Sequence, residues 1–289
     1  MNLKAKVALI NQTSQSTNLS TSTDLQQQQV TIVGGGGRMG RFFSSCLSQA
    51  GHQVNILEYS DWGQAEKLLA DIDLVLLCVP IECMVKTIAQ LSQYLSPHTA
   101  LADITSIKAP IVKAMLEYHQ GPVMGLHPMF GPDIKSFLAQ KVVICPGRQD
   151  IVFQWFLELM QSDGAELIYA TPKEHDLMMT TVQAIRHFAT FSLGAFLSQE
   201  NIDIERSLDF SSPKYRQQIE MVQRLFAQSA PLVVDIMLAT PESREAIARL
   251  GNTYSGLAKL IQQGDRDALI NEFRATDHFF QRLQKSAIN

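Results

Sequence analysis

The sequence VTIVGGGGRMG at residues 30–40 decides the fold of this chain. A short β-branched run ends in four glycines, and a segment compatible with a helix follows. If Gly35, Gly37 and Gly40 form the pattern G-x-G-x-x-G, they predict a dinucleotide-binding turn. Gly35 then permits the tight bend, Gly37 lets a pyrophosphate approach the backbone, and Gly40 lets the helix pack against the strand. A glycine-rich turn can also be purely structural, so the surrounding sequence must decide.

Strand and helix patterns alternate from residue 30 to about residue 171. We expect strands at 30–33, 54–57, 74–79, 100–103, 123–126, 142–145 and 167–169, and helices at 38–50, 64–70, 84–94, 107–119 and 151–162. This alternation predicts an α/β fold with a Rossmann-like, doubly wound sheet whose ligands bind at the carboxyl ends of its strands. The later strands follow a long loop and need not all run parallel.

The strand pattern disappears after Thr171, and residues 172–289 are predicted to form an all-α C-terminal domain. Helix breaks are expected at 211–213, 230–231, 240–241 and 264–265. Pro241 fits the first turn of a helix, and Asp265 fits an N-cap. We interpret residues 30–171 as a dinucleotide-binding domain, and the helical part, by analogy with similar folds, as a substrate-binding and dimerisation domain.

Composition excludes several classes of protein. With 289 residues, 46% of them apolar, the chain can bury a sizeable core, and its net charge of −4 argues against a nucleic-acid surface. No apolar run approaches the roughly 20 residues that cross a bilayer. The four cysteines lack C-x-x-C spacing, so we expect no metal site and a reducing, cytoplasmic location. Residues 1–29, rich in Ser, Thr, Asn and Gln, read as a flexible leader or linker.

Glu58 follows the second predicted strand, where a carboxylate can bind the ribose hydroxyls of NAD and repel the 2′-phosphate of NADP. A solvated carboxylate at a strand end is the alternative. The third predicted strand ends in Val79 and Pro80, which either line the nicotinamide side of the cleft or form an ordinary junction. We therefore predict NAD as cofactor, with contacts from Gly35, Gly37, Arg38, Met39, Gly40, Glu58, Val79 and Pro80.

Two further strand ends carry candidate catalytic groups. Ser106 and Lys108 follow the fourth strand, where a hydroxyl and an ammonium can meet a polar substrate, although Thr105 or Ser106 can equally cap the next helix. His127 opens the loop HPMFGP at 127–132, whose prolines and glycine fix the backbone. Histidine suits proton transfer because its ordinary pKa is about 6.5. We predict that His127 is catalytic.

The helical part contributes candidate anion-binding groups. Arg186 and His187 interrupt an otherwise apolar helix, and burying such groups is costly unless they are paired. Arginine forks suit carboxylates, so Arg216 and Arg224 are also candidates. Helix–helix ion pairing is the alternative, because Arg216, Glu220 and Arg224 have i,i+4 spacing. The segment 174–176 (EHD) resembles the first turn of a helix as much as a site.

These motifs together resemble prephenate dehydrogenase, and more narrowly the dehydrogenase portion of bacterial bifunctional chorismate mutase/prephenate dehydrogenases. The resemblance rests on the following segments: IVGGGGRMG at 32–40, GLHPMFGP at 125–132, QAIRHFATF at 183–191, SSPxYR at 211–216 and RLFAQ at 224–228. It extends from about residue 30 to the C-terminus. The glycine turn alone is unspecific, whereas the histidine loop and the helical motifs together are highly specific.

The resemblance implies NAD-dependent oxidative decarboxylation of prephenate to 4-hydroxyphenylpyruvate, a step towards tyrosine. His127 matches the histidine that takes the proton of the ring hydroxyl, and Ser106 matches the serine that assists it. Arg224 matches an arginine that binds a prephenate carboxylate, and His187 matches a histidine of the substrate pocket. Arg186, Arg216 and Lys108 lie in matching motifs, so substrate binding is also expected of them. The family further implies a homodimer and, often, inhibition by tyrosine.

The chain departs from the bifunctional pattern at its N-terminus. Only 29 residues precede the first predicted strand, and they do not resemble a chorismate mutase domain, so we expect no mutase activity of this chain. Arogenate dehydrogenase is the nearest alternative function. A dehydrogenase of the β-hydroxyacid type and a non-catalytic protein that binds NAD or senses tyrosine are the others. The histidine loop argues against the first of these, and the intact His127, Ser106 and Arg224 argue against the second.

Overall fold

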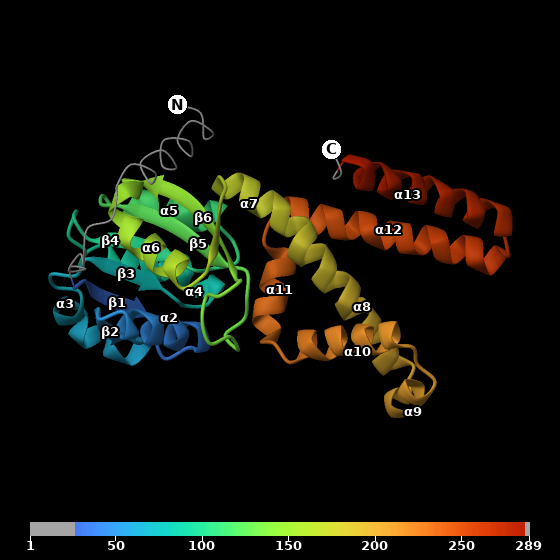
Figure 1. Cartoon of the computed structure of the whole chain (residues 1–289), viewed down its shortest axis with the longest axis horizontal. Helices are drawn as coiled ribbons and strands as arrows, with labels where there is room; N and C mark the ends of the chain where they lie inside the picture. Colours follow the sequence, from blue (N-terminus) through green and yellow to red (C-terminus); the bar gives the residue numbers. More distant parts are fainter. Residues whose placement is uncertain (1–26, 287–289) are drawn as a thin grey trace.

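The computed structural model of the chain describes residues 27–286, and its sheet contains seven strands in the order β2-β1-β3-β4-β5-β6-β7 (Figure 1). The strands are β1 (Gln29–Val33), β2 (Gln53–Leu57), β3 (Leu74–Leu77), β4 (Ala100–Asp103), β5 (Val123–Pro128), β6 (Lys141–Arg148) and β7 (Glu166–Tyr169). β5 and β6 pair antiparallel, and the other neighbours pair parallel. β6 and β7 therefore run opposite to the first five strands.

Helices cover both faces of the sheet. They are α2 (Arg38–Gln49), α3 (Ala65–Leu68), α4 (Ile81–Leu91), α5 (Ala109–Tyr118) and α6 (Gln154–Ser162), with 3₁₀ turns at Tyr59–Gln64 and Asp150–Phe153. Alternate residues of β1 enter different cores, because successive strand side chains point to opposite faces. Val30 and Ile32 pack with α2 and α6, whereas Val33 packs with α3, α4 and α5. The strands are buried on both sides, as a doubly wound sheet requires.

The chain is helical after β7. The elements are α7 (Pro172–Met179), the π-helical segment η3 (Thr180–Ile185), α8 (Arg186–Gln199), α9 (Ile204–Asp209), α10 (Pro213–Phe226), α11 (Ala230–Leu238), α12 (Pro241–Gln263) and α13 (Arg266–Ser286). Thr240 caps α12 by accepting from Ser243 N at 3.0 Å, and Asp265 accepts from Ala268 N at 3.0 Å. The fold class predicted from the sequence is confirmed. Most of the predicted leader (residues 1–26) lies outside the described residues.

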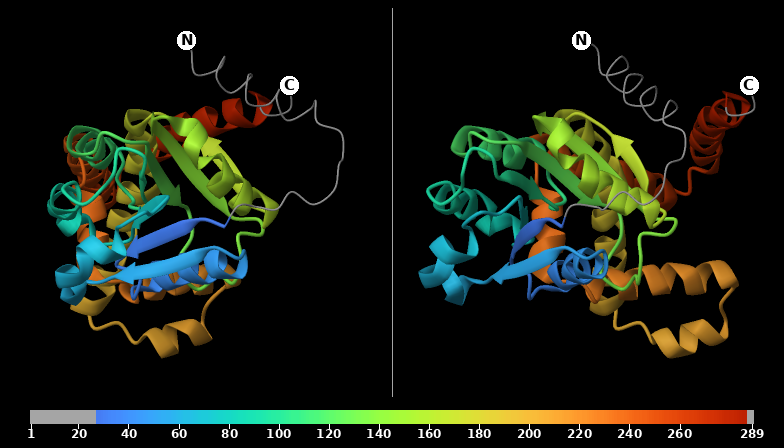
Figure 2. Two further views of the ribbon diagram at one scale, coloured as in Figure 1. Left: turned by 90° about the vertical axis from the view of Figure 1, so that its left-hand side faces the viewer. Right: turned by 60° about the vertical axis from the view of Figure 1, so that its left-hand side comes forward.

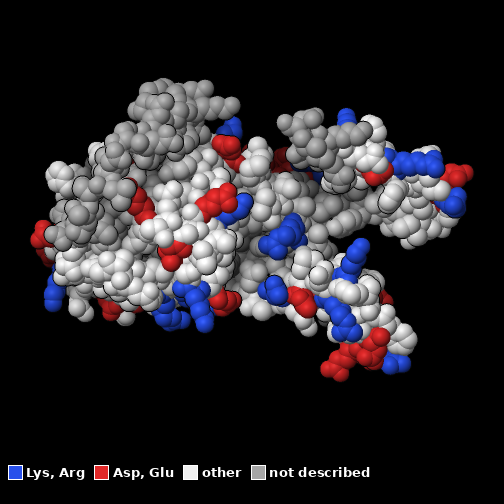
Figure 3. All heavy atoms as spheres, viewed as in Figure 1, with Lys and Arg blue, Asp and Glu red and all other residues white. Residues whose placement is uncertain are grey.

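The helical part lies beside the carboxyl ends of strands β1 to β5, and α12 and α13 project away from the sheet (Figures 1 and 2). On the face drawn in Figure 3, acidic and basic side chains are interspersed and no large area of one sign forms among the described residues. Across residues 27–286, no helix is long and apolar enough to cross a bilayer, and no three His, Cys, Asp or Glu side chains are grouped to hold a metal.

Candidate active site

The glycine turn joins β1 to α2. Gly34 has φ +79°, and a Cβ there would lie 2.8 Å from Cys78 O, so the left-handed backbone of the tight bend lies at Gly34, whereas the prediction placed the bend at Gly35. A Cβ on Gly40 would lie 2.5 Å from Gly34 O, which agrees with the close helix–strand packing expected there. Gly36 and Gly37 are exposed, and Gly37 is the N-cap residue of α2, which has no side-chain cap. First-turn N–H groups therefore remain available to phosphate oxygens.

The other predicted cofactor residues surround this turn. Glu58 is half-buried at the end of β2, and its Oε1 accepts from Gly36 N at 2.5 Å. Arg38 is exposed and pairs with Asp133 at 2.5 Å, and Met39, a half-buried residue of α2, packs against the core. Val79 and Pro80 lie between β3 and α4, where Pro80 is the N-cap. Glu58, the glycine turn and the end of β3 thus lie together at the carboxyl ends of the parallel strands.

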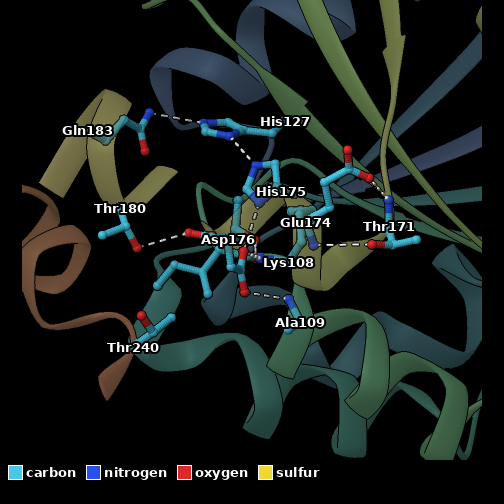
Figure 4. A network of polar contacts seen from close by, with 12 residues as sticks. Lys108, Ala109, His127, Thr171, Glu174, His175, Asp176, Thr180, Gln183 and Thr240 are labelled. Carbon is cyan, nitrogen blue, oxygen red and sulfur yellow. Dashed lines mark hydrogen bonds and ion pairs between the residues drawn. The ribbon is translucent and has the colours of Figure 1, made fainter. Parts of the chain in front are cut away.

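His127 lies in β5 at the heart of a buried polar network (Figure 4). Its Nδ1 is 2.7 Å from His175 Nε2, and His175 Nδ1 is 2.7 Å from Asp176 Oδ1. Asp176 also accepts backbone N–H groups from Lys108 at 2.8 Å and from Ala109 at 2.9 Å. His127 and His175 are 3% and 1% exposed. The carboxylate therefore anchors both histidines to the start of α5.

Lys108 is fully buried, with its Nζ paired to Asp103 and donating to Leu126 O at 2.7 Å. We predicted that this ammonium contacts the substrate. That prediction is wrong for this structure, because the ammonium is buried and already paired with Asp103. Lys108 instead holds the backbone immediately before His127. Thr105 Oγ1 also lies within hydrogen-bonding distance of Asp103 and of Ile107 O, and its single hydrogen can be donated to one of them at a time. The N-cap of α5 is Lys108, so neither Thr105 nor Ser106 caps that helix as the structural alternative expected.

The π-helical segment η3 brings Gln183 to the other side of His127. Gln183 Nε2 lies 3.3 Å from His127 Nε2, and Gln183 Oε1 is buried without a hydrogen-bond partner among the described residues. Ser106 is half-buried and lines a small cavity together with Asp176 and Gln183. Ser106 therefore shares a cavity with Gln183, the residue that His127 Nε2 faces. π-helical turns occur frequently at functional sites.

The predicted anion-binding groups of the helical part lie apart from this network. His187 is 2% exposed, with Nε2 2.8 Å from the Arg186 guanidinium and Nδ1 unpartnered within residues 27–286. On α10, Arg216 donates to Leu208 O at 2.6 Å, and the exposed Arg224 lies 3.9 Å from Glu220. In the described part of the chain no hydrogen bond or ion pair joins these four residues to His127, and their substrate-binding roles stay predictions.

Burial controls the titration of the site. The pKa of His127 lies well below 6.5, first because burial disfavours the imidazolium and then because His175 and Lys108 are close. The pKa of His187 falls to about 4, from burial and from the neighbouring Arg186. Both imidazoles are therefore neutral near pH 7. A neutral, buried imidazole is an acceptor ready for a proton.

The sequence did not single out His175 and Asp176 as parts of this network. Thr171 caps α7 and accepts from Glu174 N at 3.1 Å, so the helix-start interpretation of 174–176 is correct. The same helix start nevertheless directs His175 and Asp176 towards β5 and α5. The sequence signal available was the adjacent histidine and aspartate at 175–176.

Family models and curated relatives identify the chain. The model described as "Prephenate dehydrogenase, nucleotide-binding domain" matches residues 48–169, and "Prephenate dehydrogenase, dimerization domain" matches residues 171–275. The T-protein of Enterobacter agglomerans is 44% identical over 87% of this chain and 67% of its own length. The T-protein of Haemophilus influenzae is 41% identical with the same coverage.

A solved structure shows the same fold. Prephenate dehydrogenase from Aquifex aeolicus, in complex with hydroxyphenyl propionate and NAD+, superimposes with a TM-score of 0.69 at 19% identity, over 92% of this chain and 100% of that chain. At this identity the likeness concerns the fold alone, whereas the two family models together span most of the sequence. The chain belongs to the prephenate dehydrogenase family.

Proposed function

We propose that this chain catalyses the NAD-dependent oxidative decarboxylation of prephenate to 4-hydroxyphenylpyruvate, with His127 as the base. The observation that carries the proposal is the neutral, buried imidazole of His127, whose Nε2 faces Gln183 beside the Ser106 cavity. Loss of hydride from the alcohol carbon and of the ring carboxylate as CO₂ leaves an aromatic ring. The protein must therefore supply one proton acceptor and orient the substrate.

The residues at the edge of the sheet fit NAD. A Cβ on Gly36 would lie 2.9 Å from Glu58 Oε1, so the turn approaches the carboxylate as closely as a backbone can. NAD+, when bound, supplies the hydride acceptor. Gly37 and the first turn of α2 would hold the pyrophosphate, and Glu58 would bind the ribose hydroxyls. The same carboxylate would repel a 2′-phosphate, so we expect NADP+ to be a poor cofactor.

His127 would take the proton of the substrate hydroxyl on Nε2. Gln183 covers this atom with a long contact of 3.3 Å, which a hydroxyl can replace at little cost. Ser106 lines the cavity next to Gln183, where its hydroxyl would bond the same substrate oxygen. Arg224, together with Arg186, His187 and Arg216, would bind the two carboxylates of prephenate.

The test is NADH formation from NAD+ and prephenate by the purified chain. We expect turnover with prephenate and NAD+, much weaker turnover with NADP+, and loss of about 10²–10⁴ in kcat for His127→Asn, as removal of a positioned base predicts. The variant should still bind NAD+. A chain that binds NAD+ but oxidises neither prephenate nor arogenate would refute the proposal. An arm with arogenate identifies that alternative substrate.

Assembly, regulation and location complete the proposal. A homodimer is supported by large apolar side chains exposed on the last two helices, among them Ile261, Phe273 and Phe280. Tyrosine resembles the product closely enough to compete for the same pocket. The four cysteines are unpaired in the structure, and free thiols are typical of a reducing compartment such as the cytoplasm.

A further inference from the structure

In the hydrogen-bond network of His127, His175 and Asp176, each contact has a donor and an acceptor. The proposed reaction does not by itself determine which atom plays which role. His127 Nδ1 and His175 Nε2 are 2.7 Å apart, so one of these atoms carries a hydrogen and the other a lone pair. If His175 donated, the neutral His127 would carry its hydrogen on Nε2. The atom that faces Gln183 would then have no lone pair, and His127 could not act as a base there.

Asp176 decides between the two arrangements. Its Oδ1 accepts from Lys108 N at 2.8 Å, and its Oδ2 accepts from Ala109 N at 2.9 Å. A carboxylate that receives N–H donors on both oxygens is an acceptor towards its third neighbour as well. His175 Nδ1, at 2.7 Å, must therefore carry a hydrogen and donate it to Asp176. With its ring hydrogen on Nδ1, His175 accepts at Nε2, and His127 donates from Nδ1.

We infer that His175 and Asp176 are positioning residues that keep the lone pair of His127 on Nε2, through a hydrogen-bonded chain anchored at the first turn of α5. The inference rests on the proposed function, because it assigns the cause of the base's reactivity. Both residues act through His127, because His175 contacts its Nδ1 and Asp176 contacts His175. Once Nε2 has taken a proton, the Nδ1–H bond to His175 and the charge of Asp176 stabilise the imidazolium.

The other charged groups around His127 do not oppose this arrangement. Lys108 is the nearest cation, and its Nζ is already paired with Asp103. The β6 residue paired with His127 is Val143, and the contact from η3 is the uncharged Gln183. His175 and Asp176 are thus the groups in contact with His127, directly or through one residue, that can fix its tautomer.

The tautomer can be measured without any turnover. Nitrogen NMR of labelled imidazoles separates a protonated ring nitrogen from an unprotonated one, and His127→Asn and His175→Gln assign the signals. We expect His127 to be protonated on Nδ1 and bare on Nε2, and His175 to be likewise protonated on Nδ1. The reverse pattern would overturn the inference even if the chain oxidises prephenate.

Kinetics of matched variants test the consequence. His175→Ala should lower kcat by about 10²–10³, less than the loss of about 10⁴ on removing the aspartate behind a protease histidine. The KM values for prephenate and NAD+ should change by less than about threefold, because neither ligand touches His175. In His175→Gln the amide can still accept from His127 Nδ1, so this variant should recover at least about tenfold of the loss.

Glu174→Gln is the control, since it removes the neighbouring carboxylate and keeps a side chain able to complete the α7 capping box. Its kcat should equal that of the wild type.

In Asp176→Asn the acid limb of kcat/KM should move to lower pH, because the imidazolium of His127 loses a stabilising charge. Wild-type kcat in His175→Ala would overturn the inference, as would equal losses in all variants together with a lower Tm. An inactive wild type that shows the expected tautomers would refute the proposed function alone.

Discussion

Arg224 presents an almost free guanidinium, with its side chain 83% exposed and Glu220 3.9 Å away. Such a surface pair contributes little to stability, so the side chain is available to a carboxylate. Arg224→Ala should raise the KM for prephenate about 10–100-fold and leave kcat nearly unchanged, because a charge-assisted hydrogen bond contributes about 1.5–3 kcal/mol. Steady-state kinetics at saturating NAD+ measures this.

Arg249→Ala is the matched control for Arg224. It also has an i,i+4 glutamate, Glu245, at 3.9 Å, and its side chain is 71% exposed. Its loss should leave both kinetic constants unchanged. An unchanged KM in Arg224→Ala would remove this arginine from the pocket.

Single residues could be predicted where a sequence motif surrounds them. His127 was identified from its rigid loop, and it does lie in a buried polar network. His175 was passed over because the contact that explains it joins residues 48 positions apart. Lys108 was misjudged for a similar reason. Position at a strand end is compatible with facing either the cleft or the interior, and its partners Asp103 and Leu126 O lie inside.

The β1–α2 unit depends on contact between backbones. A Cβ on Gly40 would lie 2.5 Å from Gly34 O and 2.6 Å from Gly35 Cα, and backbone atoms cannot move aside cheaply. Gly40→Ala should therefore destabilise the fold by roughly 1–3 kcal/mol, as overpacking does, and weaken NAD+ binding. Denaturant unfolding and NAD+ titration measure the two effects.

Gly256→Ala provides the comparison within helix α12. A Cβ there meets nothing within 4 Å, so alanine adds helix propensity without a clash. This variant should be more stable than the wild type by about 0.5–1 kcal/mol. Equal behaviour of the two alanine variants would show that the glycine turn is not tightly packed.

The positions of the helices and strands could be predicted closely from local sequence patterns. The relative direction of the strands in the sheet could not. All seven predicted strands are present, and 100–103 has the predicted bounds. The antiparallel pairing of β5 with β6 depends on the path of the long loop between them, and no local sequence pattern encodes that path. The π-helical segment η3 was likewise hidden within a helical pattern, because its extra residue per turn changes no hydrophobic spacing strongly. That segment is what directs Gln183 to His127.

The α12–α13 pair sets the expected assembly of the whole molecule. These helices project from the rest of the chain (Figure 1), and Phe273 is 75% exposed in a groove with Ile261, Leu269 and Ile270. Exposed apolar area of this kind is typical of an interface. Phe273→Glu should shift the chain from dimer to monomer, measured by light scattering at matched concentrations. Lys259→Glu, a charge change on the same helix pair, is the control, and a Phe273→Glu dimer as stable as the wild type would place the interface elsewhere.

Acid should destabilise the whole fold through its buried histidines. The pKa values of His119, His127 and His187 are all lowered in the folded chain, chiefly by burial. Between these pKa values and the ordinary value of about 6.5, the unfolded chain binds more protons, so stability is complete above about pH 6.5 and falls as the pH drops. For His187, with a pKa of about 4, the loss between pH 7 and pH 5 amounts to about 2 kcal/mol.

Thermal unfolding between pH 7.5 and pH 5 measures this loss, and the range stays above the ordinary pKa values of Asp and Glu. His187→Asn cannot take up the proton, so its Tm should fall less steeply with acid than that of the wild type. His98 is exposed, so His98→Asn should keep the wild-type slope. If His187→Asn also kept that slope, His187 would not be buried in its neutral form, and the Arg186–His187 pair would have to be open to water.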